Sequence, residues 1–369
     1  MLLILFSTLF FSFIVAILLI HYQHVHAHFS ADHDINGIQK FHHTPVPRIG
    51  SVPIFAGLLV GVTLLVVKYN NDMTPVLLLV SALPVLCAGL AEDITKRVGA
   101  RLRLIAAFSS ALCGYWLLGT GLTRLDIPGL DTILAHIWPL SLLLTIVAVG
   151  GVTHAVNIID GYNGLSGMVA LLIFLALSYV SYKAGDPPLL GLCLACVGSV
   201  LGFFVWNFPR GMIFAGDGGA YLIGFLIAQI SVLLVARHPD VSPWFPLLLV
   251  IYPVFETLFS IYRKKVLRGT SPGLPDGLHL HMLIYKRLVR WMLGNQNPKH
   301  RVRLNSFTSP YLWALTALSV APAMVFWNHT PLLIACAIVF IFIYLRFYRM
   351  LILFKSPSWI RVRKPSSKT

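Results

Sequence analysis

Long apolar runs, separated by short polar segments, recur along almost the whole chain. Most runs contain about 17–20 residues, the length that an α-helix needs to cross the hydrocarbon core of a bilayer. The pattern therefore predicts an all-α polytopic membrane protein with about eleven transmembrane helices. The expected helices span 1–20, 49–67, 74–91, 104–119, 133–150, 165–182, 188–206, 219–236, 243–262, 309–328 and 331–348.

The composition agrees with a membrane environment. Hydrophobic residues make up 57% of the 369 residues and charged residues 11%, whereas a typical soluble domain is about 25% charged. No internal repeat or separate soluble unit is visible, so residues 1–369 are predicted to form a single polytopic domain. Residues 1–20 lack a basic leading segment and a small-residue cleavage site, so we expect a retained first helix rather than a signal peptide.

Lysine and arginine are distributed unevenly between the two faces that eleven crossings define. The loops of one face, together with the C-terminal segment, carry 24 of the 28 basic residues, and the other face carries 4. Because basic loops are retained in the cytoplasm, this asymmetry predicts a periplasmic N-terminus and a cytoplasmic C-terminus. The net charge of +15 also suits anionic lipid headgroups and phosphate-bearing substrates.

Acidic and histidine clusters fall in the loops of the predicted cytoplasmic face. In chain order they are Glu92-Asp93, Asn157-Ile-Ile-Asp160-Gly-Tyr-Asn163-Gly, Gly216-Asp217-Gly218-Gly219 and Asp276-Gly-Leu-His279-Leu-His281. Polar loops are expected in any multi-span protein. Four such clusters at one membrane surface, however, indicate a site there.

The carboxylates of the first and third clusters suit a metal-assisted phosphate site. Glu92 and Asp93 end an apolar helix, where adjacent carboxylates repel unless a proton, a cation or a basic partner relieves them. A structural ion pair with Lys96, one turn on, is the alternative. Asp217 lies in a glycine-rich turn, where Mg²⁺ and a pyrophosphate could approach the backbone closely, and a simple helix N-cap is its alternative role.

The remaining clusters offer groups that bind nucleotides and phosphates. Asn157, Asp160 and Asn163 are suited to a ribose, a uracil or a metal-bound phosphate. His279 and His281 lie in a basic loop with Arg268, a combination that can bind phosphate. A polybasic stretch facing the lipid headgroups would also explain some of these cations.

Taken in order, these clusters and the segment His43-Thr44-Pro45-Val46-Pro47-Arg48-Ile49-Gly50 resemble the polyprenyl-phosphate N-acetylhexosamine-1-phosphate transferase family. Bacterial members of this family begin peptidoglycan, O-antigen, common-antigen and teichoic acid synthesis, and the spacing is most similar to the O-antigen and common-antigen initiators. The chain departs from the family pattern where an aspartate becomes Glu92, an asparagine becomes His154, a second aspartate becomes Asn163 and the last histidine becomes Met282.

The resemblance implies a reaction and roles for the positions that match the family's motifs. Undecaprenyl phosphate would attack the β-phosphorus of a UDP-N-acetylhexosamine, release UMP and begin a lipid-linked, O-antigen-like envelope glycan. Asp217, with Asp93, would bind Mg²⁺ or Mn²⁺, and Asp93 with Glu92 would engage the acceptor phosphate or act as base. The expected substrate-binding residues are His43, Pro47, Arg48, Lys96, Asn157, Asp160, Asn163, Arg268, His279 and His281.

The same resemblance predicts the setting of the enzyme. It would be a multi-pass protein of the bacterial inner membrane with a cytoplasmic active site, in contact with membrane lipids and not with nucleic acid. A homodimer, the identity of the amino sugar and the glycan pathway are left open. The main alternative class is a secondary transporter, but such proteins place their binding carboxylates near the midplane, often between inverted repeats. A membrane scaffold would leave the ordered acidic motifs without a purpose.

Overall fold

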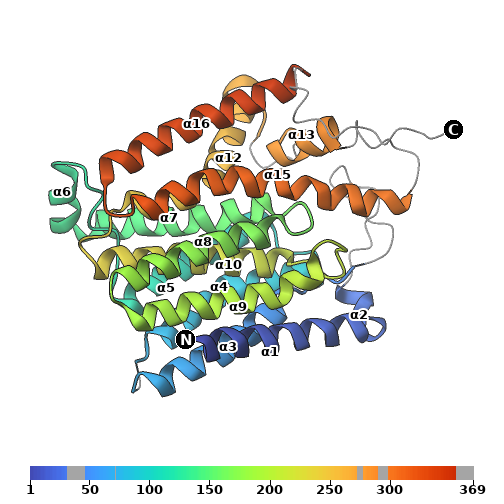
Figure 1. Ribbon diagram of the computed structural model, residues 1–369, viewed down its shortest axis with the longest axis horizontal. Coiled ribbons are helices and arrows are strands. Elements are labelled where there is room, and N and C mark those ends of the chain that lie inside the picture. Colours follow the sequence, from blue (N-terminus) through green and yellow to red (C-terminus); the bar gives the residue numbers. More distant parts are fainter. Residues whose placement is uncertain (31–45, 71, 272–276, 290–297, 355–369) are drawn as a thin grey trace.

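The computed structural model describes residues 1–30, 46–70, 72–271, 277–289 and 298–354, and confirms the all-α class: helices dominate these ranges, which contain no strand (Figure 1). The helices before the central one are α1 Leu2–His21, α2 Gln23–Ser30, α3 Ser51–Lys68, α4 Thr74–Thr95, α5 Ala100–Leu118, α6 Leu130–His136, α7 Trp138–Ile159, α8 Leu165–Lys183 and α9 Pro187–Asn207. Those that follow are α10 Gly216–Arg237, α11 Trp244–Leu249, α12 Ile251–Tyr262, the π-helical turn η1 Arg263–Leu267, α13 Leu280–Ile284, the π-helical turn η2 Tyr285–Val289, α15 Pro298–Val325 and α16 Thr330–Ile352.

Eight helices of the described ranges are long and apolar enough to cross a membrane: α1, α3, α4, α7, α8, α9, α10 and α16. The other three expected crossings coincide with α5, with α11 and α12, and with α15. Helix α5 is less apolar at its start because Arg101 and Arg103 lie in its first turn. The total of eleven crossings and the sidedness therefore stay predictions.

The expectation of one continuous helix over 243–262 is wrong. The structure breaks this segment at Val250, between α11 and α12. Pro246 and Pro253 explain the break, because proline has no N–H to donate and its ring clashes with the preceding turn of a helix. Each proline lies in the first turn of its own short helix, where an N–H has no intrahelical acceptor.

Helix α10 lies in the middle of the bundle, with neighbours on all sides (Figure 1). Of the 18 most apolar consecutive residues of α10, 94% are buried, whereas 22% of the corresponding residues are buried in α1 and in α16. It packs against α4, α7 and α8. The first residues of α10, which include Asp217, are therefore held by the core of the protein and not by a surface loop.

Small residues allow α1 to pack closely on α9. A Cβ atom at Gly202 would lie 2.5 Å from the Leu9 carbonyl oxygen and 2.8 Å from the Phe13 nitrogen, both backbone atoms of α1. Ser12 of α1 also donates a hydrogen bond to the Ser199 carbonyl at 2.7 Å. Close backbone approach of this kind lets helices associate where no hydrophobic effect drives them together.

Replacing Gly202 with alanine should lower the thermal stability of the detergent-purified protein. The added methyl group meets backbone atoms that cannot rotate away, so α1 must move off α9, at a cost of about 1–3 kcal/mol. Gly151→Ala on α7 is the matched control, because a Cβ atom there meets nothing within 4 Å. Equal unfolding midpoints for the two variants would contradict the close contact of α1 with α9.

Candidate active site

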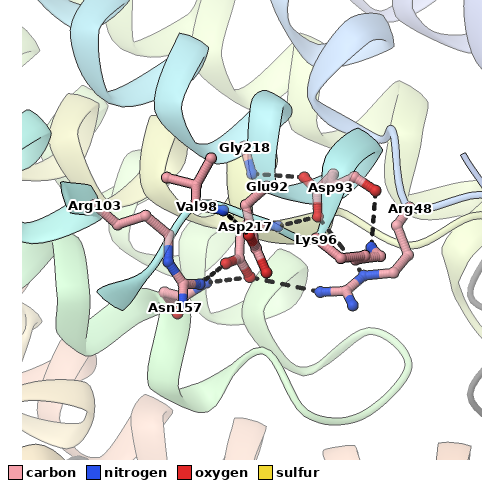
Figure 2. Close-up of polar contacts among 9 residues, drawn as sticks. All are labelled: Arg48, Glu92, Asp93, Lys96, Val98, Arg103, Asn157, Asp217 and Gly218. Carbon is pink, nitrogen blue, oxygen red and sulfur yellow. Dashed lines mark hydrogen bonds and ion pairs between the residues drawn. The ribbon is translucent and has the colours of Figure 1, made fainter. Parts of the chain in front are cut away.

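Two carboxylates from different helices meet at one end of the bundle (Figure 2). Asp93 lies in the last turn of α4 and Asp217 in the first turn of α10. Asn157, in the last turn of α7, reaches the same point and donates from Nδ2 to Asp217 Oδ1 at 3.2 Å. Three of the four polar clusters in the sequence thus share one location through the ends of three packed helices.

Asp93 supports the start of α10. Its carboxylate is fully buried and accepts the backbone N–H groups of Asp217 at 2.9 Å and of Gly218 at 2.8 Å. The first N–H groups of a helix have no intrahelical acceptor, so Asp93 supplies from α4 what an N-cap side chain normally supplies locally. Both carboxylate oxygens of Asp93 are engaged in this way, and the side chain positions Asp217.

Glycine is required where α4 and α10 meet. Gly216 has a φ of +69°, and a Cβ atom there would lie 2.4 Å from the Asp93 carboxylate. A Cβ atom at Gly89 would lie 2.6 Å from the Cα atom of Gly218. The glycine-rich first turn of α10 therefore allows the Asp93 carboxylate to reach the helix N-terminus.

Asp217 is surrounded by cationic groups. Arg103 Nη1 forms an ion pair with Oδ2, and Arg48 Nη2 lies 3.5 Å from Oδ1. Arg48 also approaches Asp93, with 3.6 Å between Nε and Oδ1. The two guanidiniums balance the two carboxylates, so this part of the site is close to neutral before any ligand binds.

The segment that carries Arg48 is attached to the turn before α10. The Phe214 N–H donates to the Pro47 carbonyl at 2.9 Å, and the Gly50 N–H donates to the Phe214 carbonyl at 2.9 Å. These backbone hydrogen bonds give Pro47 a positioning role, since they place Arg48 beside Asp217.

Glu92 and Lys96 shape the turn that follows Asp93. Glu92 Oε2 accepts the Val98 N–H at 2.7 Å, and Lys96 Nζ donates to the Asp93 carbonyl at 2.8 Å (Figure 2). Lys96 has a φ of +56° and ends α4. The structure therefore places the Lys96 ammonium on the backbone carbonyl of Asp93.

A polar cavity of about 280 Å³ opens beside Asp217. The residues that line it come from the segment before α3, the end of α7 with the turn after it, the start of α10, and residues 277–289, which we call the histidine segment: Arg48, Asn157, Ile158, Asp160, Gly161, Tyr162, Asp217, His279, His281 and Met282. Six of these were predicted from the sequence as site residues. The cavity brings the second, third and fourth clusters to one surface.

Asp160 ends α7 and accepts a hydrogen bond from Ser166 Oγ. Burial raises the pKa of Asp160 to about 6, and the Ser166 hydroxyl and the Arg48 charge limit the rise. The carboxyl group is therefore mostly ionised at neutral pH and available as an acceptor.

The histidine segment contributes two stacked imidazoles. The rings of His279 and His281 lie 5.3 Å apart with an interplanar angle of 2°. Burial, followed by the charge of His279, lowers the pKa of His281 to about 3, so its ring is neutral at physiological pH. His279 Nδ1 lies 2.9 Å from a carboxylate oxygen of the buried Glu256.

Several expected site residues lie elsewhere. The Asn163 side chain is buried and donates from Nδ2 to the Pro209 carbonyl and the Ser306 hydroxyl, both at 3.4 Å, so it packs the turn against α15. Arg268 is exposed and does not line the cavity. His43 lies outside the described residues.

Other residues of the site did not emerge from the sequence as candidates. Arg103 was counted only as one of the basic residues that set the sidedness, although its place in the first turn of α5 aims it at Asp217. Tyr162 lies inside the second cluster and lines the cavity. The buried Glu256, which accepts a hydrogen bond from His279, was not among the site residues predicted from the sequence.

The donor set fits a magnesium ion that is shared with a substrate. Among the described residues, no group of three or more His, Cys, Asp or Glu side chains could hold a metal alone. Mg²⁺ is usually bound by one or two carboxylates plus substrate phosphates and water. Asp217 lines the cavity and can be such a carboxylate, with the Asn157 side chain beside it.

Comparison with known proteins gives consistent similarities. Residues 75–235 match the family model described as glycosyl transferase family 4. The chain is 27% identical over 246 residues to a probable undecaprenyl-phosphate N-acetylglucosaminyl 1-phosphate transferase of Bacillus subtilis strain 168, a match that covers 66% of each chain. It is 28% identical over 269 residues to the undecaprenyl-phosphate alpha-N-acetylglucosaminyl 1-phosphate transferase of Yersinia pestis, covering 67% of this chain and 68% of the relative.

A third relative has a different transferred sugar in its name. The chain is 31% identical over 199 residues to a phospho-N-acetylmuramoyl-pentapeptide-transferase of Bacillus mycoides strain KBAB4, covering 51% of this chain and 61% of the relative. The matches thus span about two thirds of the length of these relatives.

Proposed function

We propose that this chain, which matches the glycosyl transferase family 4 model over residues 75–235 and is similar to the named relatives, belongs to the polyprenyl-phosphate N-acetylhexosamine-1-phosphate transferase family and transfers an N-acetylhexosamine 1-phosphate from a UDP-sugar to undecaprenyl phosphate. The observation that carries the proposal is the position of Asp217. It lies at the end of a membrane-embedded bundle, between two arginines, in the wall of a polar cavity. A cytosolic nucleotide and a lipid-anchored phosphate can meet only at such a place.

The charges of the site support a role for a divalent cation. The donor diphosphate and the acceptor phosphate together bring close to four negative charges, because a phosphate monoester has a second pKa near 6. Asp93 and Asp217 already offset the charges of Arg48 and Arg103. The substrates therefore need additional positive charge, which Mg²⁺ or Mn²⁺ supplies when bound at Asp217 by neutralising the phosphoryl oxygens.

The reaction is a displacement at the β-phosphorus of the donor. A phosphate oxygen of the acceptor forms the new P–O bond, and the bond from the β-phosphorus to the bridging oxygen breaks. UMP leaves, and the lipid product carries a sugar diphosphate. The acceptor is already mostly a dianion at neutral pH, so the protein has little need to remove a proton, which agrees with the engagement of both Asp93 oxygens by backbone N–H groups.

The chain's own residues would mainly bind and orient the two substrates. Arg48 and Arg103 would contact phosphate oxygens once a cation takes their place at Asp217. Asn157 and Asp160 would bind the nucleotide, and His279 with His281 the diphosphate or sugar. Positioning and charge neutralisation account for most of the catalysis in phosphoryl transfer. We further propose that the active site faces the cytoplasm and that the product begins a lipid-linked envelope glycan.

Detergent-purified protein should release UMP from at least one UDP-N-acetylhexosamine, and only when undecaprenyl phosphate and Mg²⁺ are both present. A panel of UDP-sugars, with lipid or metal omitted in turn, tests this expectation and identifies the sugar. Release without lipid would indicate hydrolysis instead of transfer. Folded protein that releases no UMP with any donor would contradict the proposed function, and substrate flux into vesicles would then indicate a transporter.

A further inference from the structure

The buried carboxylate of Glu256 joins three parts of the chain. It belongs to α12, is fully buried, and has no role in the chemistry described above. Its oxygens accept hydrogen bonds from His279 Nδ1 at 2.9 Å, from the Tyr344 hydroxyl at 2.6 Å and from the Leu280 N–H at 3.2 Å. Tyr344 lies on α16, 88 residues away in the sequence.

The hydrogen bond between His279 and Glu256 determines which nitrogen of His279 is available to a ligand. An ionised carboxylate can only accept hydrogen bonds, so His279 carries a proton on Nδ1 and its Nε2 atom is left for other partners. The ring of His281 stacks in parallel on that of His279. Its buried Nδ1 atom has no hydrogen-bond partner among the described residues, although His281 lines the cavity. Both imidazoles are thus oriented, directly or indirectly, by Glu256.

Helix α16 lies near α13 in Figure 1 and contacts the histidine segment at two further points. The Tyr348 hydroxyl accepts from Arg263 Nη1 at 2.8 Å and lies 3.1 Å from the Leu278 carbonyl, to which it donates. Arg287 Nη1 donates to the Leu351 carbonyl at 2.8 Å, at the end of α16. Helix α16 therefore contacts the histidine segment near both of its ends. Both elements lie beyond residues 75–235, the region of the family match.

We propose that Tyr344 is a positioning residue for the donor substrate: through Glu256 it sets the orientation of His279 and His281, which bind the diphosphate-sugar part of the UDP-sugar. The inference rests on the proposed transferase function. A carboxylate that is buried among apolar residues needs its hydrogen bonds to keep one conformation. Loss of the Tyr344 hydroxyl leaves Glu256 Oε2 without its shortest hydrogen bond and loosens the stacked histidine pair.

Steady-state kinetics of Tyr344→Phe distinguish positioning from a contribution to the fold alone. The phenylalanine ring keeps the packing against Phe255, whose ring centroid lies 5.0 Å from that of Tyr344. The variant should raise the KM for the UDP-sugar about tenfold, as loss of a residue that orients a ligand typically does, and leave the KM for undecaprenyl phosphate unchanged. Tyr262→Phe is the matched control, because Tyr262 is an exposed tyrosine of the same region, at the end of α12.

Each other outcome would overturn the inference. A variant with less activity but an unchanged donor KM would show that the hydroxyl affects only the fraction of folded protein, and so would a variant that unfolds in detergent. An increase of the donor KM in Tyr262→Phe as well would make the effect non-specific. If the wild type itself releases no UMP, the proposed function fails, and the inference fails with it.

Discussion

Asp217→Asn should abolish UMP release, with a loss of about a thousandfold or more relative to the wild type. The substitution removes the negative charge of Asp217, which lines the cavity, and with it the affinity for a divalent cation. It leaves the backbone N–H of residue 217 intact, so the hydrogen bond to Asp93 is retained. Raising the Mg²⁺ or Mn²⁺ concentration over a wide range tests whether the loss comes from metal binding.

The fold should tolerate this change. Asp217 is buried, but its ionic partners Arg48 and Arg103 are partly exposed, so water can solvate both guanidiniums when residue 217 loses its charge, and asparagine keeps the shape of the side chain. Thermal unfolding of Asp217→Asn should match that of Asp240→Asn, an exposed aspartate outside the site that serves as control. Activity close to the wild type at saturating Mg²⁺ would exclude Asp217 as the metal ligand.

The sequence was sufficient to predict the features that depend on local patterns. Apolar runs predicted the helices because a membrane span requires a continuous stretch of suitable length, and eight of these runs coincide with helices that could span a membrane. The end of one span and the start of another also placed Asp93 and Asp217 at the same surface. The glycine at 216 was part of a predicted turn, and its positive φ is the physical reason why that turn needs glycine.

Features that depend on contacts between distant residues could not be predicted in this way. Tyr344 and Glu256 are 88 residues apart, and an apolar run containing tyrosines is typical of any membrane helix. Asn163 resembled a ligand residue by its place in a motif, yet the structure turns its amide toward Pro209 and Ser306. Periodicity carries no information on which side of a turn a side chain will lie, because packing against α15 decides it.

The role of Asp93, at the centre of the site, also depends on contacts that the sequence does not reveal. The sequence places it beside Glu92 as a candidate for metal binding, for contact with the acceptor phosphate or for proton removal. The structure shows both of its oxygens accepting backbone N–H groups of α10. Its effect on the reaction would then be exerted through Asp217, whose position depends on that helix N-terminus.

Asp93→Asn should reduce both activity and stability, whereas Asp217→Asn reduces activity alone. An asparagine side chain has one carbonyl oxygen, so its amide nitrogen must face the N–H of either Asp217 or Gly218, and one buried donor loses its acceptor. An unsatisfied buried donor costs about 1–3 kcal/mol, which should lower the unfolding midpoint measurably. We expect UMP release to fall about a hundredfold, because Asp217 no longer has a fixed position. An Asp93→Asn protein that is as stable as the wild type but inactive would instead favour direct participation of the Asp93 carboxylate as a base or metal ligand.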